Sequence, residues 1–380
     1  MLLLARPWLA QATPESFCAG NDVLLHALGQ GVEARVLIDA PITAVYHLLA
    51  SRPVLPGRDR HLLLRAEPLK PGHSDDYKVT ATIPLPIWHV QISMNMKQQT
   101  LLQDLPHQHV LWQQQQVSGD MAVYDSQTEL FGVDPTHTLI IYRVTIKPDP
   151  NFWLLRLLPH GLHTLVNFLP WFTAAGFAFN LQEHWPSLAT TPAACSPPPG
   201  WVRIRRQPSA VDSWFTWLYP LPLSQSQRRL SQLQRYHEFL PAVQKVTVQR
   251  RGNDLYSAWT LTDHLGPFTL HHNDLLHVRL NPGNWLYWGE DAGHHRLSGQ
   301  WIMQTSSSGQ TWSQLSIHCP ERSPDWVSGW LNYMPYPRSS AELLGGLLLM
   351  ERSTQWLNSG NRPNQKSSTP PLARHTKSAP

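Results

Sequence analysis

Short stretches of alternating hydrophobic and polar residues follow one another along the first half of the chain and predict an antiparallel β-sheet. The first is VEARVLI at 32–38. ITAVYHLLA at 42–50 places its apolar residues three and four positions apart, which predicts a short helix. Six further strands are expected after turns that contain Pro, Gly or Asp, and they lie at 61–67, 76–86, 88–99, 109–117, 121–131 and 138–148.

The second half repeats the same plan. SWFTWLY at 213–219 predicts a strand, SQSQRRLSQLQ and the residues after it predict a helix that ends at Pro241, and KVTVQRR at 245–251 predicts the next strand. The repeated order indicates an internal duplication. Further strands are then expected at 255–262, 268–274, 275–280, 284–290, 299–305 and 311–319.

Each half is expected to close with an apolar helix that prolines interrupt. Together with the strands, these helices predict an α+β fold in two domains, at 31–185 and at 209–358. The two closing helices are expected at 149–185, with breaks at Pro159 and Pro170, and at 324–357, with breaks at Pro335 and Pro337.

Three segments are expected to lie outside these domains. Residues 1–30 are interpreted as a lead-in with a short helix at LLHALGQ, residues 186–208 as a proline-rich linker, and residues 359–380 as a disordered tail. The triple proline in SPPPG favours an extended spacer over a packed element.

The first residues leave two compartments open. Ala10-Gln11-Ala12 has the form of a signal-peptide cleavage site, but Arg6-Pro7 interrupts the apolar run and no basic segment precedes it. We therefore expect a cytoplasmic protein, with export as the alternative if the N-terminus is a signal peptide. FWLLRLLPHGLHTLVNFLPWFTAAGFAF could be buried or lie on a membrane surface, so membrane-surface contact is a further expectation.

Composition supports packed domains and argues against a nucleic-acid partner. With 42% hydrophobic and 15% charged residues, a chain of 380 residues can bury two cores, and its 17 tryptophans are many. The formal net charge of +4 arises from scarce acidic residues rather than from a basic run. The oligomeric state stays open.

The sequence shows no motif for catalysis, a metal or a cofactor. The three cysteines have no C-x-x-C spacing. Histidines cluster only at His271-His272 with His277 and at His294-His295, and consecutive residues of a strand point to opposite faces, so neither pair is expected to bind one ion. A G-x-S-x-G motif, a P-loop and a dinucleotide glycine motif are absent from the sequence. No catalytic residue, metal or cofactor is therefore expected.

One junction carries a resemblance to a known superfamily. YHEFLPAVQKVTVQRR at 236–251 joins a helix that ends in Phe-Leu-Pro to a lone strand. This junction resembles that of the SRPBCC or START-like (Bet v 1-like, helix-grip) superfamily, and most nearly its coenzyme Q-binding and polyketide cyclase families. The resemblance implies a tandem duplication of helix-grip domains, each a curved antiparallel β-sheet wrapped around a long C-terminal helix. It also implies an apolar cavity between sheet and helix.

The residues expected to line these cavities are mostly aromatic. A carrier needs an apolar pocket of about 300–1,000 Å³ with a few polar groups, and aromatic side chains suit a large flat or long-chain guest. The candidates are Trp88, Met94, Met96, Trp112, Trp153, Phe168, Trp171 and Phe172 in the first half, and Trp259, Trp285, Tyr287, Trp288, Trp301, Met303, Trp326 and Trp330 in the second.

The pattern and the resemblance together predict binding and transport or presentation of a hydrophobic small molecule, such as a lipid, a quinone or a polyketide-like compound. One alternative is an enzyme of the polyketide cyclase or aromatase type, because cyclisation needs mainly a shaped cavity with a few polar groups. For such chemistry, Arg65, Tyr77, His89, Asp263 or His264 could serve. Another alternative is a non-catalytic docking protein in which one half is degenerate and filled by its own tryptophans.

Overall fold

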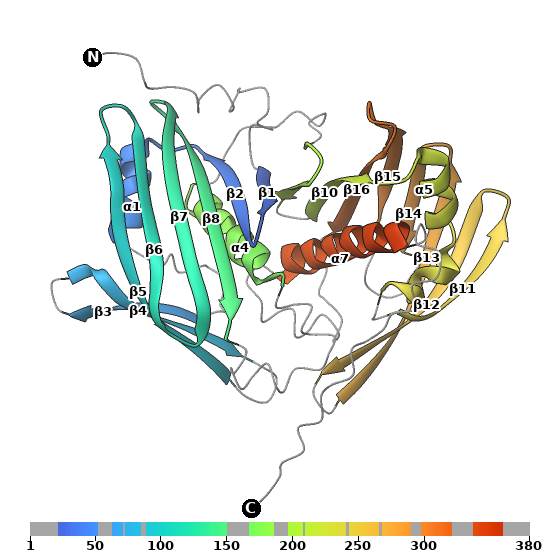
Figure 1. Cartoon of the computed structure of the whole chain (residues 1–380), viewed down its shortest axis with the longest axis horizontal. Coiled ribbons are helices and arrows are strands. Elements are labelled where there is room, and N and C mark those ends of the chain that lie inside the picture. Colours follow the sequence, from blue (N-terminus) through green and yellow to red (C-terminus); the bar gives the residue numbers. More distant parts are fainter. Residues whose placement is uncertain are drawn as a thin grey trace, which may run out of the picture.

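The fold is seen in a computed structural model (Figure 1). The structure describes residues 22–51, 63–70, 73–84, 89–149, 167–185, 197–207, 210–240, 243–265, 268–289, 298–320 and 337–359.

The chain forms strands and helices in nearly the same order twice. The first half contains β1 (Asp22–Leu28), β2 (Gly31–Ile38), α1 (Ile42–Ser51), β3 (Leu63–Lys70), β4 (His73–Pro84), β5 (His89–Asp104), β6 (His109–Gly119), β7 (Met121–Asp134), β8 (His137–Pro148) and α4 (Leu169–His184). The second half contains β9 (Trp201–Arg206), β10 (Ala210–Tyr219), α5 (Leu223–Leu230), the 3-10 helix η2 (Leu233–Glu238), β11 (Val243–Arg251), β12 (Asp254–Leu265), β13 (Phe268–Asn281), β14 (Asn284–Gly289), β15 (Ser298–Thr305), β16 (Thr311–Pro320) and α7 (Pro337–Ser359).

These strands form one sheet of 16 strands, in the order β11-β12-β13-β14-β15-β16-β10-β9-β1-β2-β8-β7-β6-β5-β4-β3. All neighbouring strands are antiparallel. In each half the last strand pairs with the strand that precedes the first helix, β8 with β2 and β16 with β10. The halves join where β1 pairs with β9.

Burial on both faces holds this joint together. Leu25 of β1 lies directly opposite Val202 of β9, and both side chains are fully buried. From the other face, the Asp22 carboxylate accepts hydrogen bonds from the Arg205 guanidinium at 2.7 and 3.2 Å. Apolar contact on one face and a charged pair on the other therefore link the halves.

Helices α4 and α7 pack on the same face of the sheet, α4 on strands of the first half and α7 on strands of the second (Figure 1). Side chains of directly paired residues share a face. A row of such residues runs from the contact with Phe177 of α4 to the contact with Gly346 of α7, through Tyr142, Ala34, Leu25, Val202 and Phe215. We call this the inner face and the opposite one the outer face. Apolar residues of both halves meet there in one buried cluster.

One hydrogen bond recurs in both halves and marks the duplication. Thr138 donates its hydroxyl to the Ala40 carbonyl at 2.7 Å, and Thr311 donates to the Leu221 carbonyl at the same distance. Each carbonyl lies two residues beyond the residue paired with that threonine. The repeated order of elements and this repeated contact agree with the expected tandem organisation.

The structure corrects the interpretation of two segments expected to lie outside the domains. The LLHALGQ stretch contributes to strand β1 rather than to a short helix. The proline-rich segment contains strand β9, whose alternation of Val and Ile with Arg fits a strand with one apolar side. The expected domain boundaries themselves stay a prediction.

The helices also differ in detail from the expectation. Pro170 lies at the start of α4 and Pro337 at the start of α7, which are positions that proline favours in a helix. The single helix expected before Pro241 is α5 followed by η2. The expected strands at 268–274 and 275–280 are one strand, β13. The remaining parts of the two closing helices lie outside the described residues.

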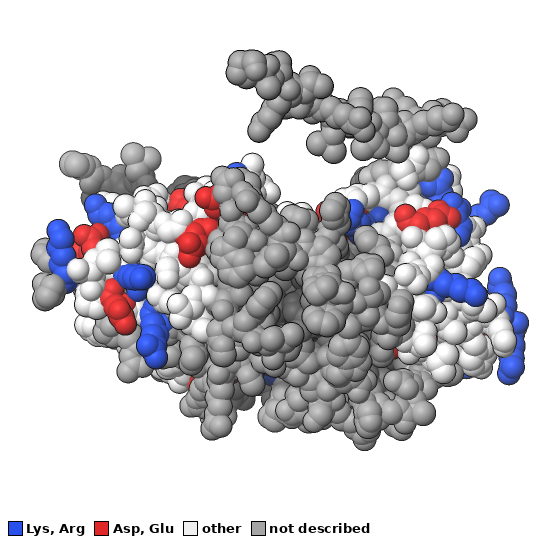
Figure 2. All heavy atoms as spheres, turned by 90° about the horizontal axis from the view of Figure 1, so that it is seen from below, with Lys and Arg blue, Asp and Glu red and all other residues white. Residues whose placement is uncertain are grey.

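None of the described helices combines the length and the apolar composition needed to cross a membrane. Figure 2 shows Lys and Arg at both ends of the viewed face, with Asp and Glu among them. The compartment and the membrane-surface contact stay predictions.

Candidate ligand-binding faces of the sheet

The inner face of the first half is fixed by the contact between sheet and α4. Tyr142 of β8 stacks on Phe177 of α4, with ring centroids 4.1 Å apart. Thr128 of β7 is paired with Tyr142, and Trp112 of β6 is paired with Thr128. Through these pairs the inner face continues from β8 across β7 and β6 to β5, where Thr100 is paired with Trp112.

A row of polar side chains crosses this inner face. Gln114 donates to the Gln98 side-chain carbonyl at 2.9 Å, and Ser126 donates to the Gln114 side-chain carbonyl at 3.3 Å. The hydroxyl oxygens of Tyr124 and Tyr142 are 3.1 Å apart. These side-chain hydrogen bonds are not needed for the backbone pairing of the strands. At positions that face a core, apolar side chains are more common.

A tyrosine and methionine cluster borders the polar row. Tyr77, Val79, Met94 and Met96 are buried together, apart from the main core, with Tyr124 packed against them. Methionine adapts its shape to its neighbours because its side chain is unbranched and polarisable. The inner face of the first half therefore combines adaptable apolar surface with hydroxyl and amide groups.

Burial keeps the phenols of this face protonated. It raises the pKa of Tyr77, and the neighbouring Tyr124 raises it further. It also raises the pKa of Tyr124 and, well above its usual range, that of Tyr142. At neutral pH these hydroxyls can thus donate as well as accept hydrogen bonds.

The inner face of the second half is filled more by aromatic side chains. Trp285 and Trp301 contact edge to face, with centroids 5.7 Å apart, and Trp301 donates its indole N–H to Ser313 at 2.7 Å. Gly346 of α7 lies on the Phe215 ring so closely that a Cβ atom there would overlap it. Sheet and helix therefore meet without a gap at this point.

One acidic side chain interrupts this apolar surface. Glu342, in the second turn of α7, is only 7% exposed, and its Oε2 accepts a hydrogen bond from Ser213 at 2.8 Å. Burial raises the pKa of Glu342 to about 8, although Ser213 and Cys319 act to lower it and Asp212 raises it. Among the described residues, its Oε1 has no hydrogen-bond partner. A protonated carboxyl group thus lies between α7 and the sheet.

Tyr287 lies close to the same position. Its ring crosses Gly299 on the neighbouring strand, and its hydroxyl donates to the Ser316 carbonyl. Any side chain at Gly299 would collide with this ring. Burial raises the pKa of Tyr287, and Glu342 raises it further, so this phenol also stays protonated.

The structure places most of the predicted lining residues on the inner face or against it. Trp288 instead lies on the outer face, where its ring centroid is 3.9 Å from that of His277. The predicted residues Trp88, Trp153, Trp326 and Trp330 lie outside the residues whose side chains are described. On the inner face or against it are Met94, Met96, Trp112, Phe168, Trp171, Phe172, Trp259, Trp285, Tyr287, Trp301 and Met303.

The polar residues on the inner face of the two halves were not predicted from the sequence. They are Gln114, Ser126, Tyr142 and Glu342. For Gln114 the signal lies in HVLWQQQQV, where alternation with Val110 and Trp112 places it on their side of the strand. For Glu342 the sequence gives no such signal, because α7 carries two carboxylates, Glu342 and Glu351, and the pattern does not tell which one is buried.

The residues considered for cyclase chemistry do not converge among the described side chains. Tyr77 lies in the methionine cluster, whereas Arg65 is exposed. The side chains of His89, Asp263 and His264 lie outside the described set. Likewise, within the described ranges no three potential metal ligands come together.

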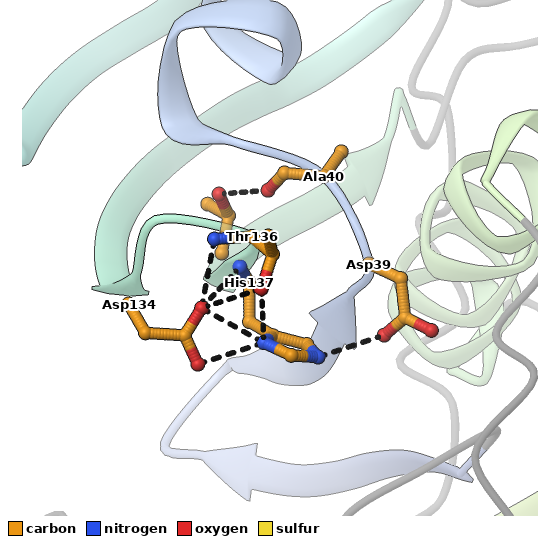
Figure 3. A network of polar contacts seen from close by, with 6 residues as sticks. Asp39, Ala40, Asp134, Thr136 and His137 are labelled. Carbon is orange, nitrogen blue, oxygen red and sulfur yellow. Dashed lines mark hydrogen bonds and ion pairs between the residues drawn. The ribbon is translucent and has the colours of Figure 1, made fainter.

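A histidine flanked by two carboxylates lies at the β7–β8 turn (Figure 3). The His137 Nδ1 atom is 2.7 Å from Asp134 Oδ2, and its Nε2 is 3.6 Å from Asp39 Oδ1. Asp134 also accepts from the backbone N–H of Thr136, and hydrogen bonds of this turn lower the pKa of Asp134 to about 2. This network holds the turn against the residues before α1 and so contributes to the stability of the fold.

No protein-family model matches the chain, and no curated protein matches it. Among solved structures, it is similar to the di-domain ARO/CYC StfQ from the steffimycin biosynthetic pathway, at 13% identity over 86% of this chain and 99% of that one, with a TM-score of 0.32. It is similar to the Zhui aromatase/cyclase from Streptomyces sp. R1128, at 15% identity over 40% of this chain and 96% of that one, with a TM-score of 0.34.

A further similarity is to a fragment of the STAR-related lipid transfer protein from Xanthomonas axonopodis, at 10% identity over 42% of this chain and 93% of that one, with a TM-score of 0.31. Aromatase/cyclases and lipid-transfer proteins are among the classes that the resemblance at 236–251 implies. The architecture described above follows from the strand pairing of the chain itself.

Proposed function

We propose that the first half binds a hydrophobic small molecule between the inner face of its sheet and α4, and that the protein carries or presents this molecule without changing it. The proposal assigns the chain to a tandem of helix-grip domains, at 31–185 and 209–358. A lipid, a quinone or a polyketide-like compound has the required chemistry, because each combines a large apolar body with a few oxygen atoms.

The polar row on the inner face is the observation that carries this proposal. A side chain such as Gln114 is costly to bury, and an apolar residue would pack the same position without that cost. Its hydrogen bonds to Gln98 and Ser126 hold the amide in place on this face, beside the hydroxyl groups of Tyr124 and Tyr142. An apolar surface with a few polar groups is typical of sites that bind and orient small molecules.

The experiment begins with native mass spectrometry of the purified protein and identification of any apolar molecule that is released. Decylubiquinone and oleic acid are then titrated while tryptophan fluorescence is recorded, since Trp112 lies on this inner face. Gln114→Leu is expected to weaken binding about tenfold, because it removes hydrogen bonds and keeps the size of the side chain.

Gln113→Leu is the matched control. Gln113 precedes Gln114 on β6, faces the other way and donates to Asp125 at 3.0 Å, so its replacement should leave the affinity unchanged. A protein that releases no apolar molecule and whose fluorescence ignores both probes would refute carriage by the first half. A released molecule that differs from the one supplied would favour the cyclase or aromatase alternative.

A further inference from the structure

Glu342 is placed where a carboxyl group has little structural use. It lies in the second turn of α7 and is 7% exposed, in a helix whose buried residues include Leu343, Leu347 and Met350. The hydrogen bond from Ser213 satisfies only Oε2. A glutamine at position 342 would join helix and sheet without burying an acid. An apolar residue at 342, together with alanine at 213, would do the same.

The residues around this carboxyl on the sheet side combine small polar and apolar side chains. Ser213 is paired with Ile317 and Cys319 with Val211 near the end of the β10–β16 pairing, and Gly299 lies opposite Ile317 on the neighbouring strand. Tyr287 closes the side towards β14. The tight contact of Gly346 with Phe215 is one turn further along α7. The carboxyl thus lies one helical turn before this tight contact.

We propose that Glu342, with Ser213 and Cys319, forms a second binding site on the inner face, which takes an acceptor oxygen, such as a carbonyl, of an uncharged apolar molecule. This site belongs to the second half and does not require the site in the first half. It extends the proposed binding of apolar molecules to the second half. The protonated carboxyl donates the hydrogen bond to the ligand oxygen, while Ser213 holds the other carboxyl oxygen in place.

Binding at this site depends on the proton of Glu342. Among the described residues, the titratable groups that face it are Tyr287 from β14 and Cys319 from β16, and Asp212 from β10 acts on it from the outer face. Tyr287 stays protonated, and Asp212 accepts a hydrogen bond of 2.6 Å from His318 on the outer face. As the pH rises above about 8, Glu342 loses its proton and with it the donor. The affinity for an uncharged acceptor should then fall.

Nile red tests this site, because it is an uncharged apolar dye with a carbonyl acceptor. It is titrated into the full-length protein from pH 6 to pH 9.5, and binding is followed by dye emission. Wild-type protein should lose affinity above pH 8, with up to a tenfold loss per pH unit. Glu342→Gln keeps an N–H donor and should bind the dye without this pH dependence.

Two more variants complete the test. Glu342→Leu removes the donor and should bind about tenfold more weakly at pH 7. Glu351→Gln changes an exposed acid on the same helix and should behave as wild type. Near-ultraviolet circular dichroism of each variant reports whether the fold is kept.

Two results would overturn the site: a loss of binding above pH 8 that persists in folded Glu342→Gln, or equal affinity of folded Glu342→Leu and wild type at pH 7. Binding of Nile red to the first half adds only a background that the substitutions at Glu342 leave unchanged. Conversely, failure of the first-half site appears as equal probe binding by the Gln114→Leu and wild-type proteins. The two failures are therefore distinguishable.

Discussion

A carboxyl group that is removed from water favours its protonated form, and Glu342 shows what this does to stability. Its pKa rises from the usual value of 4.5 to about 8 in the fold. Between these two values the folded chain holds a proton that the unfolded chain has released. The free energy of unfolding should therefore fall as the pH rises from 4.5 to 8, by about 1.4 kcal/mol per pH unit from this group, and level off above 8.

Glu342→Gln should remove most of this slope and raise the stability at pH 7.5 by a few kcal/mol, because an amide does not ionise. Urea unfolding at several pH values, followed by circular dichroism, measures the effect. Glu351→Gln should keep the wild-type slope. An unchanged slope in Glu342→Gln would mean that the carboxyl is not buried as the structure places it.

The sequence could not single out Glu342 because one acid in a helix usually marks a solvent-facing position. Glu351, nine residues later in the same helix, is such a position and is exposed. The two glutamates differ in their contact with the sheet beneath the helix. Only the fold brings Ser213 and Cys319 next to Glu342. The aromatic lining was easier to predict, since residues such as Trp112 and Trp301 are large and apolar wherever they lie.

Among the elements, α7 depends on a close approach to the sheet. A Cβ atom at Gly346 would overlap the Phe215 ring, whereas a Cβ atom at the adjacent Gly345 would meet nothing within 4 Å. Alanine favours helices over glycine by about 1 kcal/mol. The two substitutions should therefore change stability in opposite directions.

Gly345→Ala should stabilise the protein by up to about 1 kcal/mol. Gly346→Ala should destabilise it by roughly 1–3 kcal/mol, because helix and ring must move apart. The free energy of unfolding in urea decides the matter. Equal gains from both substitutions would show that α7 does not rest on Phe215.

The elements that sequence patterns predict poorly here are β1 and β9. The run LLHAL has apolar residues that fit either a helix or a buried strand, and periodicity does not separate the two in so short a stretch. Strand β9 has six residues and follows directly after prolines and a glycine, which are typical of a linker. Longer strands such as β7 and β8 alternate over more residues and were expected correctly.

At the scale of the molecule, these two strands turn a tandem repeat into one continuous sheet. The duplication was visible in the sequence because each half has its own strands and closing helix. The joint was not, because β1 and β9 pair across the two halves, and pairing between distant segments leaves no local pattern. The expectation of a spacer at 186–208 therefore failed for the part that forms β9.

Because the halves share a sheet and an apolar cluster, they should unfold together in one calorimetric transition. Leu25→Lys tests this dependence in the full-length chain. It places a charged side chain at a fully buried position opposite Val202, which should cost at least about 3 kcal/mol and separate the unfolding of the two halves into two transitions.

Leu28→Lys is the matched control, because the same substitution falls on the same strand at a side chain that is already 41% exposed. It should leave a single transition and change stability by less than about 0.5 kcal/mol. Two transitions in the wild-type protein would mean that β1 and β9 pair too weakly to couple the halves. A single transition that persists in Leu25→Lys would mean that contacts away from this pair of strands carry the coupling. With both results as expected, the contact of β1 with β9 couples the unfolding of the two halves.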